Sequence, residues 1–305
     1  MTKNASFLDL ETISTQIIRT DFCECFEIIP GDIPSLAAHK FGASLEASVY
    51  TAIFNMTKPR ICLDVGSNVG VTALFFAKHC EQVYAFEPNS YVFPVLQRNA
   101  EQSGKGVVAF PFGLSDKASE LTLHIHRNWN TGASSFVAEN IKPVASKTMQ
   151  LAPAKVEVGD EVKVKQQIQH VDFIKIDTEG FEAKVLLGLK ECIIRDKPVV
   201  ALEWNADSTK EQFKEHELFQ MLFSDYLCFG LGESWNKTLY PTVASRIKRW
   251  ILKNVLKTHR PPALQKFFPK GRYDLVFFIP ERFSQVVQGF SFLPTNYIPI
   301  VGRVS

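Results

Sequence analysis

A glycine-containing turn between an apolar segment and a helical segment constrains this chain most strongly. The stretch DVGSNVG (64–70) ends the apolar run Ile61–Val65 and precedes a segment with helical spacing, Thr72–Cys80. Glycines let the backbone turn sharply and approach a ligand closely, and the free amides of a helix N-terminus face that ligand. Because ligands of open α/β sheets bind outside the carboxyl ends of strands, the turn predicts a binding site.

Strand-like and helix-like segments alternate along most of the chain. Helices are expected at residues 45–54, 72–80, 88–103, 180–189 and 209–223. Strands are expected at 61–65, 82–87, 106–112, 121–126, 171–176, 198–203, 226–231 and 273–279, with a strand or hairpin at 156–164. This alternation predicts an open α/β sheet with largely parallel strands.

Three successive strand ends each present an acid. Asp64 ends the first strand, Glu87 follows 23 residues later at the end of the second, and Asp116 follows the third. A carboxylate at the second strand end suits both hydroxyls of a ribose. A dinucleotide fingerprint would need glycines where Asn68 and Val71 stand, and an acid beside the turn repels a pyrophosphate. The alternative is a set of ordinary turns and caps, where Asp and Ser are common.

With these motifs the sequence resembles the FkbM family of S-adenosylmethionine-dependent methyltransferases. The resemblance covers about residues 60–205 and extends to the strand at 273–279. It is carried by LDVGSNVG (63–70), AFEP (85–88), GLSD (113–116), TGASSF (131–136) and, most specifically, VDFIKIDTEGFE (171–182).

The resemblance implies the Rossmann-like class I methyltransferase fold. That fold has a seven-stranded, mostly parallel sheet with an antiparallel last strand and helices on both faces. The implied cofactor is S-adenosyl-L-methionine, and the implied reaction is O-methylation of a hydroxyl on a saccharide, glycolipid or secondary metabolite. An NAD-type oxidoreductase and a non-catalytic binding module with the same fold are the alternatives.

Carried over by position, the resemblance implies a set of cofactor contacts. Glu87 would hold the ribose, Ser115 and Asp116 the adenine, and Asp177 would lie close to the methyl donor at the end of the fourth strand. The contacts expected around the methionine part of the cofactor are Asp64, Gly66, Ser67, Asn68 and Gly70.

The motif at 171–182 can also be interpreted from its residues alone, without the family resemblance. In a strand, Lys175 and Asp177 point to the same face, where a buried ammonium needs a partner. Asp177 is the nearest candidate, and neighbouring strands offer others. A functional interpretation places Asp177 and Glu179 at the mouth of the site. The structural alternative makes Lys175 and Asp177 an ion pair and Glu182 a helix cap.

Methyl transfer to a hydroxyl requires removal of a proton, which a positioned acid-base side chain accelerates. The catalytic candidates are Asp177, Glu179 and His126, with Glu203 as a further possible base. His126 lies near Trp129 in a segment that forms either a wall for a sugar acceptor or a solvated ribbon. No metal site is expected, because no dense cluster of ligands stands out.

The nearly even charge hides a basic segment. The chain carries 34 basic and 32 acidic residues, a net charge of +2, but residues 243–272 carry +9 with no acid, leaving −7 for the rest. A basic amphipathic helix around Trp250 suits an anionic membrane or a lipid-linked acceptor. The alternative is a solvated helix packed on the domain. No nucleic-acid partner is expected, since no base-stacking motif accompanies the charge.

The expected organisation is a helical N-terminal lead-in, residues 1–59, and a methyltransferase domain, residues 60–305, with a basic helical insertion at 232–272. No apolar run reaches the ~18 residues that span a bilayer, and no secretory signal is visible. We therefore expect a cytoplasmic protein, with peripheral contact at the inner membrane face as an added hypothesis. The sequence leaves the oligomeric state and the identity of the acceptor open.

Overall fold

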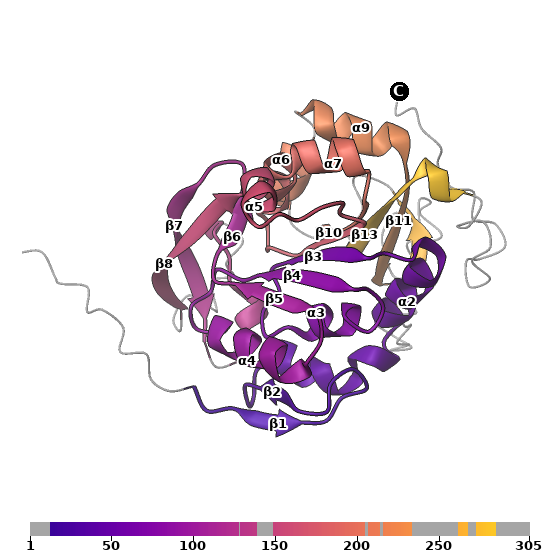
Figure 1. Ribbon diagram of the computed structural model, residues 1–305. Helices are drawn as coiled ribbons and strands as arrows, with labels where there is room; N and C mark the ends of the chain where they lie inside the picture. Colours follow the sequence, from indigo (N-terminus) through magenta and orange to yellow (C-terminus); the bar gives the residue numbers. More distant parts are fainter. Residues whose placement is uncertain are drawn as a thin grey trace, which may run out of the picture.

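The computed structural model describes residues 13–127, 129–138, 149–204, 207–213, 216–233, 262–267 and 273–284. Its main sheet has eight strands (Figure 1). In chain order they are β3 (Ile61–Val65), β4 (Gln82–Phe86), β5 (Val107–Phe110), β9 (Phe173–Ile176), β10 (Val199–Trp204), β11 (Tyr226–Glu233), β12 (Pro262–Lys266) and β13 (Tyr273–Pro280). Their order across the sheet is β12-β11-β13-β10-β9-β3-β4-β5.

The pairing confirms the expected seven-stranded sheet and adds one strand. β3 pairs in parallel with β4 and β9, and the parallel arrangement continues through β5 on one side and β10 on the other. β13 is antiparallel to both β10 and β11. The eighth strand, β12, pairs antiparallel with β11 at the edge. It lies within the predicted insertion, where the sequence indicated no strand.

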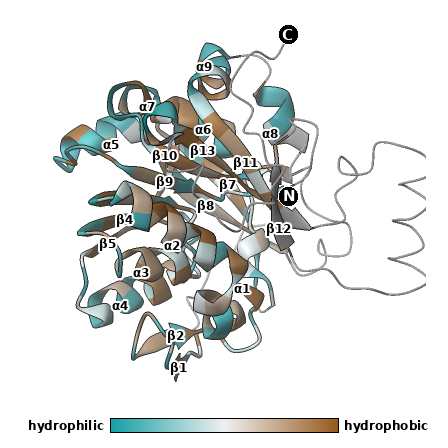
Figure 2. Cartoon of the chain, turned by 90° about the vertical axis from the view of Figure 1, so that its right-hand side faces the viewer, coloured by the Kyte–Doolittle hydropathy of each residue, from teal (hydrophilic) through white to brown (hydrophobic). Residues whose placement is uncertain are grey.

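Helices cover both faces of the sheet, as expected. α2 (Leu45–Thr57), α3 (Val71–Phe76) and α4 (Phe93–Ser103) lie on one face. The other face carries α5 (Gly159–Lys165), α6 (Glu182–Gly188), α7 (Lys190–Asp196) and α9 (Glu217–Asp225). Figure 2 shows hydrophobic residues along β10 and β13 and hydrophilic residues over α5 and α7 at the outside.

The period-two alternation of the strands separates the two cores. Phe173 of β9 packs with Tyr50 and Phe76 of the first helical layer. The neighbouring residue, Ile174, faces the other layer, where it belongs to the same cluster as Leu186 of α6. Because successive strand side chains point to opposite faces, a near-continuous apolar run serves both layers.

A second, three-stranded sheet lies beside the first. It contains β6 (Gly113–Ser115), β7 (Ser119–His126) and β8 (Met149–Val158), with β8 in the middle. The strand or hairpin predicted at 156–164 is therefore only partly right, since β8 ends at Val158 and helix α5 follows at once. The alternating valines of this stretch resemble a strand. Gly159 instead begins α5, and it packs so closely on Leu189 that an added Cβ would lie 2.6 Å from the Leu189 side chain.

Two further predicted elements have other bounds in the structure. The strand expected at 106–112 is confirmed as β5 but ends at Phe110, and β6 of the other sheet begins after it at Gly113. The segment expected as one helix at 209–223 gives α8 (Asp207–Gln212) and α9. His216 separates the two helices, because its Nδ1 accepts a hydrogen bond from the Leu218 N–H at 3.1 Å and so caps α9.

The N-terminal lead-in is mixed rather than wholly helical. It contains the antiparallel strands β1 (Gln16–Ile18) and β2 (Phe26–Ile28), helix α1 (Ile33–Ala37), the 3₁₀ helix η1 (Ala38–Ala43) and α2. Strands of three residues are too short to show a period, which explains why the sequence missed them. β2 lies on α4, where the Asn99 side chain bonds the backbone N–H and C=O of Glu27 at 2.6 and 2.9 Å. The lead-in therefore packs into the common core.

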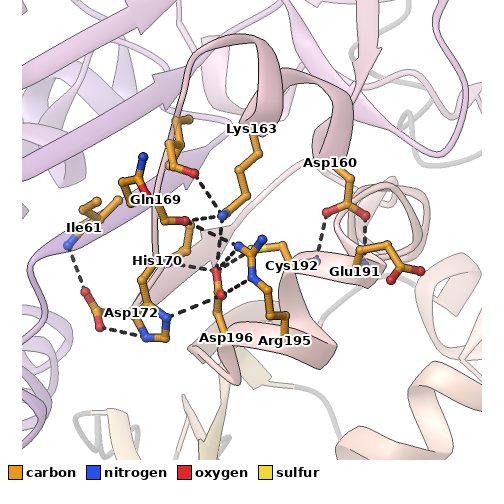
Figure 3. Close-up of polar contacts among 12 residues, drawn as sticks. Ile61, Asp160, Lys163, Gln169, His170, Asp172, Glu191, Cys192, Arg195 and Asp196 are labelled. Atoms are coloured by element: carbon orange, nitrogen blue, oxygen red, sulfur yellow. Dashed lines mark hydrogen bonds and ion pairs between the residues drawn. The ribbon is translucent and has the colours of Figure 1, made fainter.

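A polar network ties the amino ends of the strands together (Figure 3). The Asp172 carboxylate accepts the backbone N–H groups of Arg60 and Ile61 at 2.9 and 3.0 Å, which joins β9 to β3. Asp196 of α7 accepts the Val171 N–H at 3.0 Å and lies 3.4 Å from the buried Lys163 ammonium of α5. This network lies at the opposite edge of the sheet from the strand ends where ligands bind.

None of the helices within the described ranges is both long enough and apolar enough to cross a bilayer. Most of the basic segment at 243–272, including the helix predicted around Trp250, lies outside the described residues. Contact of that segment with a membrane or a lipid-linked acceptor stays a prediction.

Candidate active site

A cavity of about 360 Å³ opens where the strands of the main sheet end. Such a volume lies within the range of about 300–1,000 Å³ that is common for small-molecule sites. Its walls come from the turn after β3, the ends of β4, β9 and β10, the segment around β6, the loop after β7 and the N-terminal segment. This is the position predicted from the DVGSNVG turn.

The turn after β3 is held in a conformation that depends on glycine. Gly66 has φ +82°, and a Cβ at this residue would lie 1.9 Å from the carbonyl oxygen of Asp177. Gly70 has φ +93° at the start of α3. Asn68 has φ +50°, a conformation that Asn tolerates better than most residues. Gly66, Ser67 and Asn68 line the cavity, whereas Gly70 supports the turn behind them.

Glu87 presents a prearranged carboxylate to the cavity. It is 7% exposed, and its two oxygens accept the backbone N–H groups of Asn68 and Asn89, both at 2.8 Å. Burial raises the pKa of Glu87 to about 7, although the two N–H groups work in the opposite direction. The acid expected to hold a ribose therefore lies in the wall of the cavity.

Asp64 and Lys175 form a buried charge pair beneath the turn. One Asp64 oxygen accepts the Thr72 hydroxyl at 2.7 Å, and the other lies 3.5 Å from the Lys175 ammonium. Lys175 also lies 3.2 Å from Asp177, which confirms the ion pair predicted from the motif. Burial alone would lower the pKa of Lys175, but the carboxylates of Asp177 and Asp64 raise it. Asp64 itself does not line the cavity, so its expected contact with a cofactor stays a prediction.

Three carboxylates meet at the ends of β9 and β10. Asp177, Glu179 and Glu203 each place one oxygen within 4.8 Å of the others, a spacing at which they could hold a metal ion. All three line the cavity. Burial, together with the charges of Asp177 and Glu179, raises the pKa of Glu203. A proton held by Glu203 reduces the repulsion among the three carboxylates. The expectation that no metal is bound stays a prediction.

Glu182 has a structural role, but it is not the helix cap given as its alternative, since the N-cap of α6 is Phe181, without a side-chain capping bond. The Glu182 carboxylate accepts the backbone N–H groups of Thr178 and Gly180 at 3.0 and 2.9 Å, and it also accepts the hydroxyl of Thr209. These bonds shape the turn that carries Glu179, whose φ is +53°. Glu182 thus orients the turn and does not line the cavity.

The loop after β7, which carries the TGASSF motif, closes one side of the cavity. Thr131, Gly132, Ser134 and Phe136 line the cavity. The Thr131 hydroxyl lies 3.0 Å from the Asn68 side-chain nitrogen, which joins this loop to the turn after β3.

Besides Asp64 and Gly70, three further predicted site residues lie away from the cavity wall. Ser115 is buried and donates to Asp116 at 3.1 Å, while Gly113 and Leu114 of the same segment line the cavity. His126 is 3% exposed, and its Nδ1 has no hydrogen-bond partner among the described residues. Burial lowers the pKa of His126 and favours the neutral ring. Roles for Ser115, Asp116 and His126 stay predictions.

The N-terminal segment contributes a wall that the sequence did not indicate. Pro34, Ala37, Phe41 and Glu46 line the cavity. Glu46 lies in the first turn of α2, after the N-cap Ser44, where an acid is common for helix-dipole reasons alone. No local signal therefore distinguished it from an ordinary first-turn acid.

Comparison with known proteins agrees with this geometry. A model of the methyltransferase FkbM domain matches residues 64–228. Hexuronic acid methyltransferase AglP of Haloferax volcanii is 27% identical over 133 residues, or 43% of this chain and 50% of AglP. Methyltransferase sdnD of Sordaria araneosa is 28% identical over 166 residues, or 46% of this chain and 64% of sdnD. The chain spans about half to two thirds of the length of these two relatives.

Among solved structures, methyltransferase FkbM from Methylobacillus flagellatus KT superposes with a TM-score of 0.42 and 15% identity, over 73% of this chain and 44% of that one. The strand order, the single antiparallel strand β13 among the seven, and the cavity at the strand ends define a class I methyltransferase fold. Within that class the chain belongs to the FkbM methyltransferase domain family.

Proposed function

We propose that the protein is an S-adenosylmethionine-dependent O-methyltransferase that acts on a hydroxyl of a saccharide, glycolipid or secondary metabolite. The observation that carries the proposal is the position of Glu87. Its carboxylate lies in the cavity wall, held by two backbone N–H groups, next to the glycine turn of the family motif. Membership of the FkbM family supports the same reaction.

The chemistry of the cavity fits S-adenosylmethionine. Asp177, Glu179 and Glu203 give one part of the cavity acidic character, which suits a ligand with a sulfonium and an ammonium group. The turn Gly66–Asn68 lets the ligand approach the backbone, and Glu87 offers oxygens to a ribose. When bound, S-adenosylmethionine supplies a methyl group that its positively charged sulfur activates.

Side chains of this protein orient the cavity walls and contact the donor and the acceptor. Asn68 and Thr131 hold the turn and the loop after β7 together, which orients both walls of the cavity. We assign Asp177 and Glu179 to the contact with the donor's amino group or with the acceptor hydroxyl. Alignment of the two reactants is itself a large source of rate acceleration.

The relatives point to the class of acceptor. AglP is named as a hexuronic acid methyltransferase, so a sugar acid is the first acceptor to test. Transfer of labelled methyl groups to free glucuronic acid, its methyl glycoside and a non-sugar alcohol would be measured side by side. A labelled product with either sugar supports a saccharide acceptor, and labelling of the alcohol alone contradicts it.

Calorimetric titration with S-adenosylhomocysteine tests the cofactor directly. We expect micromolar binding by the wild type and a loss of at least tenfold in Glu87→Ala. The matched control is Glu101→Gln on the exposed side of α4, which should bind as the wild type does. No binding by the wild type, or equal binding by Glu87→Ala, overturns the assignment. Binding of NAD instead would favour the oxidoreductase alternative.

A further inference from the structure

Glu46 is a carboxylate of the cavity that lies outside the matched family domain. The match begins at residue 64, whereas Glu46 belongs to the first turn of α2, whose N-cap Ser44 accepts the Ala47 N–H at 3.0 Å. Glu46 is half-buried and lines the same cavity as Asp177 and Glu203. An acid in this turn suits the helix dipole, but the dipole does not require its side chain to line the cavity, as Glu46 does.

The groups around Glu46 come from three elements. Lys175 and Asp177 face it from β9, Tyr50 lies one turn further along α2, and Asp274 approaches from β13. Lys175 attracts the Glu46 carboxylate, but it is shared with Asp64 and Asp177. Burial raises the pKa of Glu46 to about 7, with Lys175 opposing and Asp177 adding to the shift. The carboxyl group can therefore take up and release a proton near neutral pH.

The order of strands places Glu46 away from the ribose end of the cavity. Glu87 follows β4, and the groups that face Glu46 belong to β9 and β13. β9 is two strands from β4 in the sheet, which is about 10 Å at the usual strand spacing. Pro34, Ala37 and Phe41 line the cavity from the same N-terminal segment as Glu46. An acceptor molecule on the β9 side of the cavity would thus meet Glu46.

We propose that Glu46 is a catalytic residue of the acceptor subsite, where its carboxylate receives the proton of the acceptor hydroxyl. This inference rests on the proposed methyl transfer. The acceptor oxygen forms a bond to the methyl carbon while its O–H proton passes to a Glu46 oxygen. The bond between sulfur and methyl breaks, its electron pair stays on sulfur, and a neutral thioether results. Glu46 then releases the proton to water at the cavity mouth.

The charge of Glu46 near the reacting methyl position can be tested without an acceptor. Sinefungin carries an ammonium-bearing carbon where S-adenosylhomocysteine has its neutral sulfur. We expect wild type to bind sinefungin more tightly than S-adenosylhomocysteine by calorimetry at pH 8. In Glu46→Gln this preference should fall about tenfold, while affinity for S-adenosylhomocysteine stays within twofold and reports an intact fold. Glu101→Gln is the matched control and should keep the preference.

The pH dependence adds a second readout. In the wild type, the preference for sinefungin should rise between pH 6 and pH 8 as Glu46 loses its proton, and Glu46→Gln should flatten this rise. Asp177→Asn is measured in parallel, because Asp177 also faces the cavity. If Asp177→Asn abolishes the preference and Glu46→Gln keeps it, the role of Glu46 is overturned while the cofactor assignment stands. If the wild type binds neither compound, the proposed function itself fails.

Discussion

Asp32 accepts a hydrogen bond from the backbone N–H of Thr131 at 2.8 Å and a second from the Thr131 hydroxyl at 3.1 Å. The two residues are 99 positions apart, one in the N-terminal segment and one in the loop after β7. Asp32 is fully buried and also caps α1 by accepting the Ser35 N–H. Because Thr131 in turn bonds Asn68, the N-terminal segment is coupled to the turn at the cavity.

Asp32→Asn should weaken both the fold and the binding of S-adenosylhomocysteine. Loss of buried, charge-assisted hydrogen bonds is expected to lower the free energy of unfolding by about 1–3 kcal/mol, measured by urea denaturation. Affinity by calorimetry should fall several-fold, since Thr131 loses its anchor. Asp225→Asn, at the exposed end of α9, should change neither quantity. Unchanged binding in Asp32→Asn would show that the coupling does not reach the cavity.

The pair of Asp32 and Thr131 also shows what can and cannot be predicted from the sequence. The turn at Gly66 and the acids at Glu87 and Asp177 were predicted, because glycine and a strand-end carboxylate report local backbone needs. The contribution of Asp32 and Glu46 was not, since each looks like an ordinary cap or first-turn acid. Their role arises only when distant segments pack together, and no local spacing records that.

The ion pair of Lys175 with Asp177 was predicted from the two-residue repeat of a strand, and the structure confirms it. The second contact of the Lys175 ammonium, with Asp64, depends on the register of β3 against β9, where Asp64 lies opposite Lys175. A single chain segment contains no information about that register. His126 illustrates the converse, because its strand was predicted correctly, yet its side chain is buried away from the cavity.

Two glycines with positive φ offer a matched test of the turn. Gly104 has φ +60° with nothing within 4 Å of an added Cβ, whereas at Gly66 the Cβ would meet the Asp177 carbonyl at 1.9 Å. Gly104→Ala should therefore cost about 1 kcal/mol from backbone conformation alone. Gly66→Ala should cost clearly more in urea unfolding and abolish binding of S-adenosylhomocysteine. Equal effects of the two variants would contradict the steric reason given for Gly66.

The buried Lys175 predicts a strong coupling with Asp64. Lys175→Met should lower the free energy of unfolding by about 3–5 kcal/mol, since it leaves the fully buried Asp64 without its counter-charge. Asp64→Asn in the same background should restore part of this loss. A double-mutant cycle by urea denaturation measures the coupling. Strictly additive effects would mean that the ammonium contributes nothing to the burial of Asp64.

The raised pKa of Glu87 makes a signed prediction for stability against pH. The folded carboxyl has a pKa of about 7 against 4.5 for the ordinary group, so between these values the folded state holds a proton that the unfolded chain has lost. The contribution of Glu87 to the free energy of unfolding is therefore fully present below pH 4.5 and is lost as the pH rises through 7. The loss approaches about 3 kcal/mol at most.

Glu87→Gln removes this titration and isolates it from that of Glu46, which has the same direction. The wild type should lose stability relative to Glu87→Gln between pH 5 and pH 8, and the difference at pH 5 serves as the reference for lost hydrogen bonds. Urea denaturation at four pH values measures the trend. Parallel curves for the two proteins would mean that Glu87 is ionised in the folded state throughout, with its charge stabilised by the Asn68 and Asn89 N–H groups.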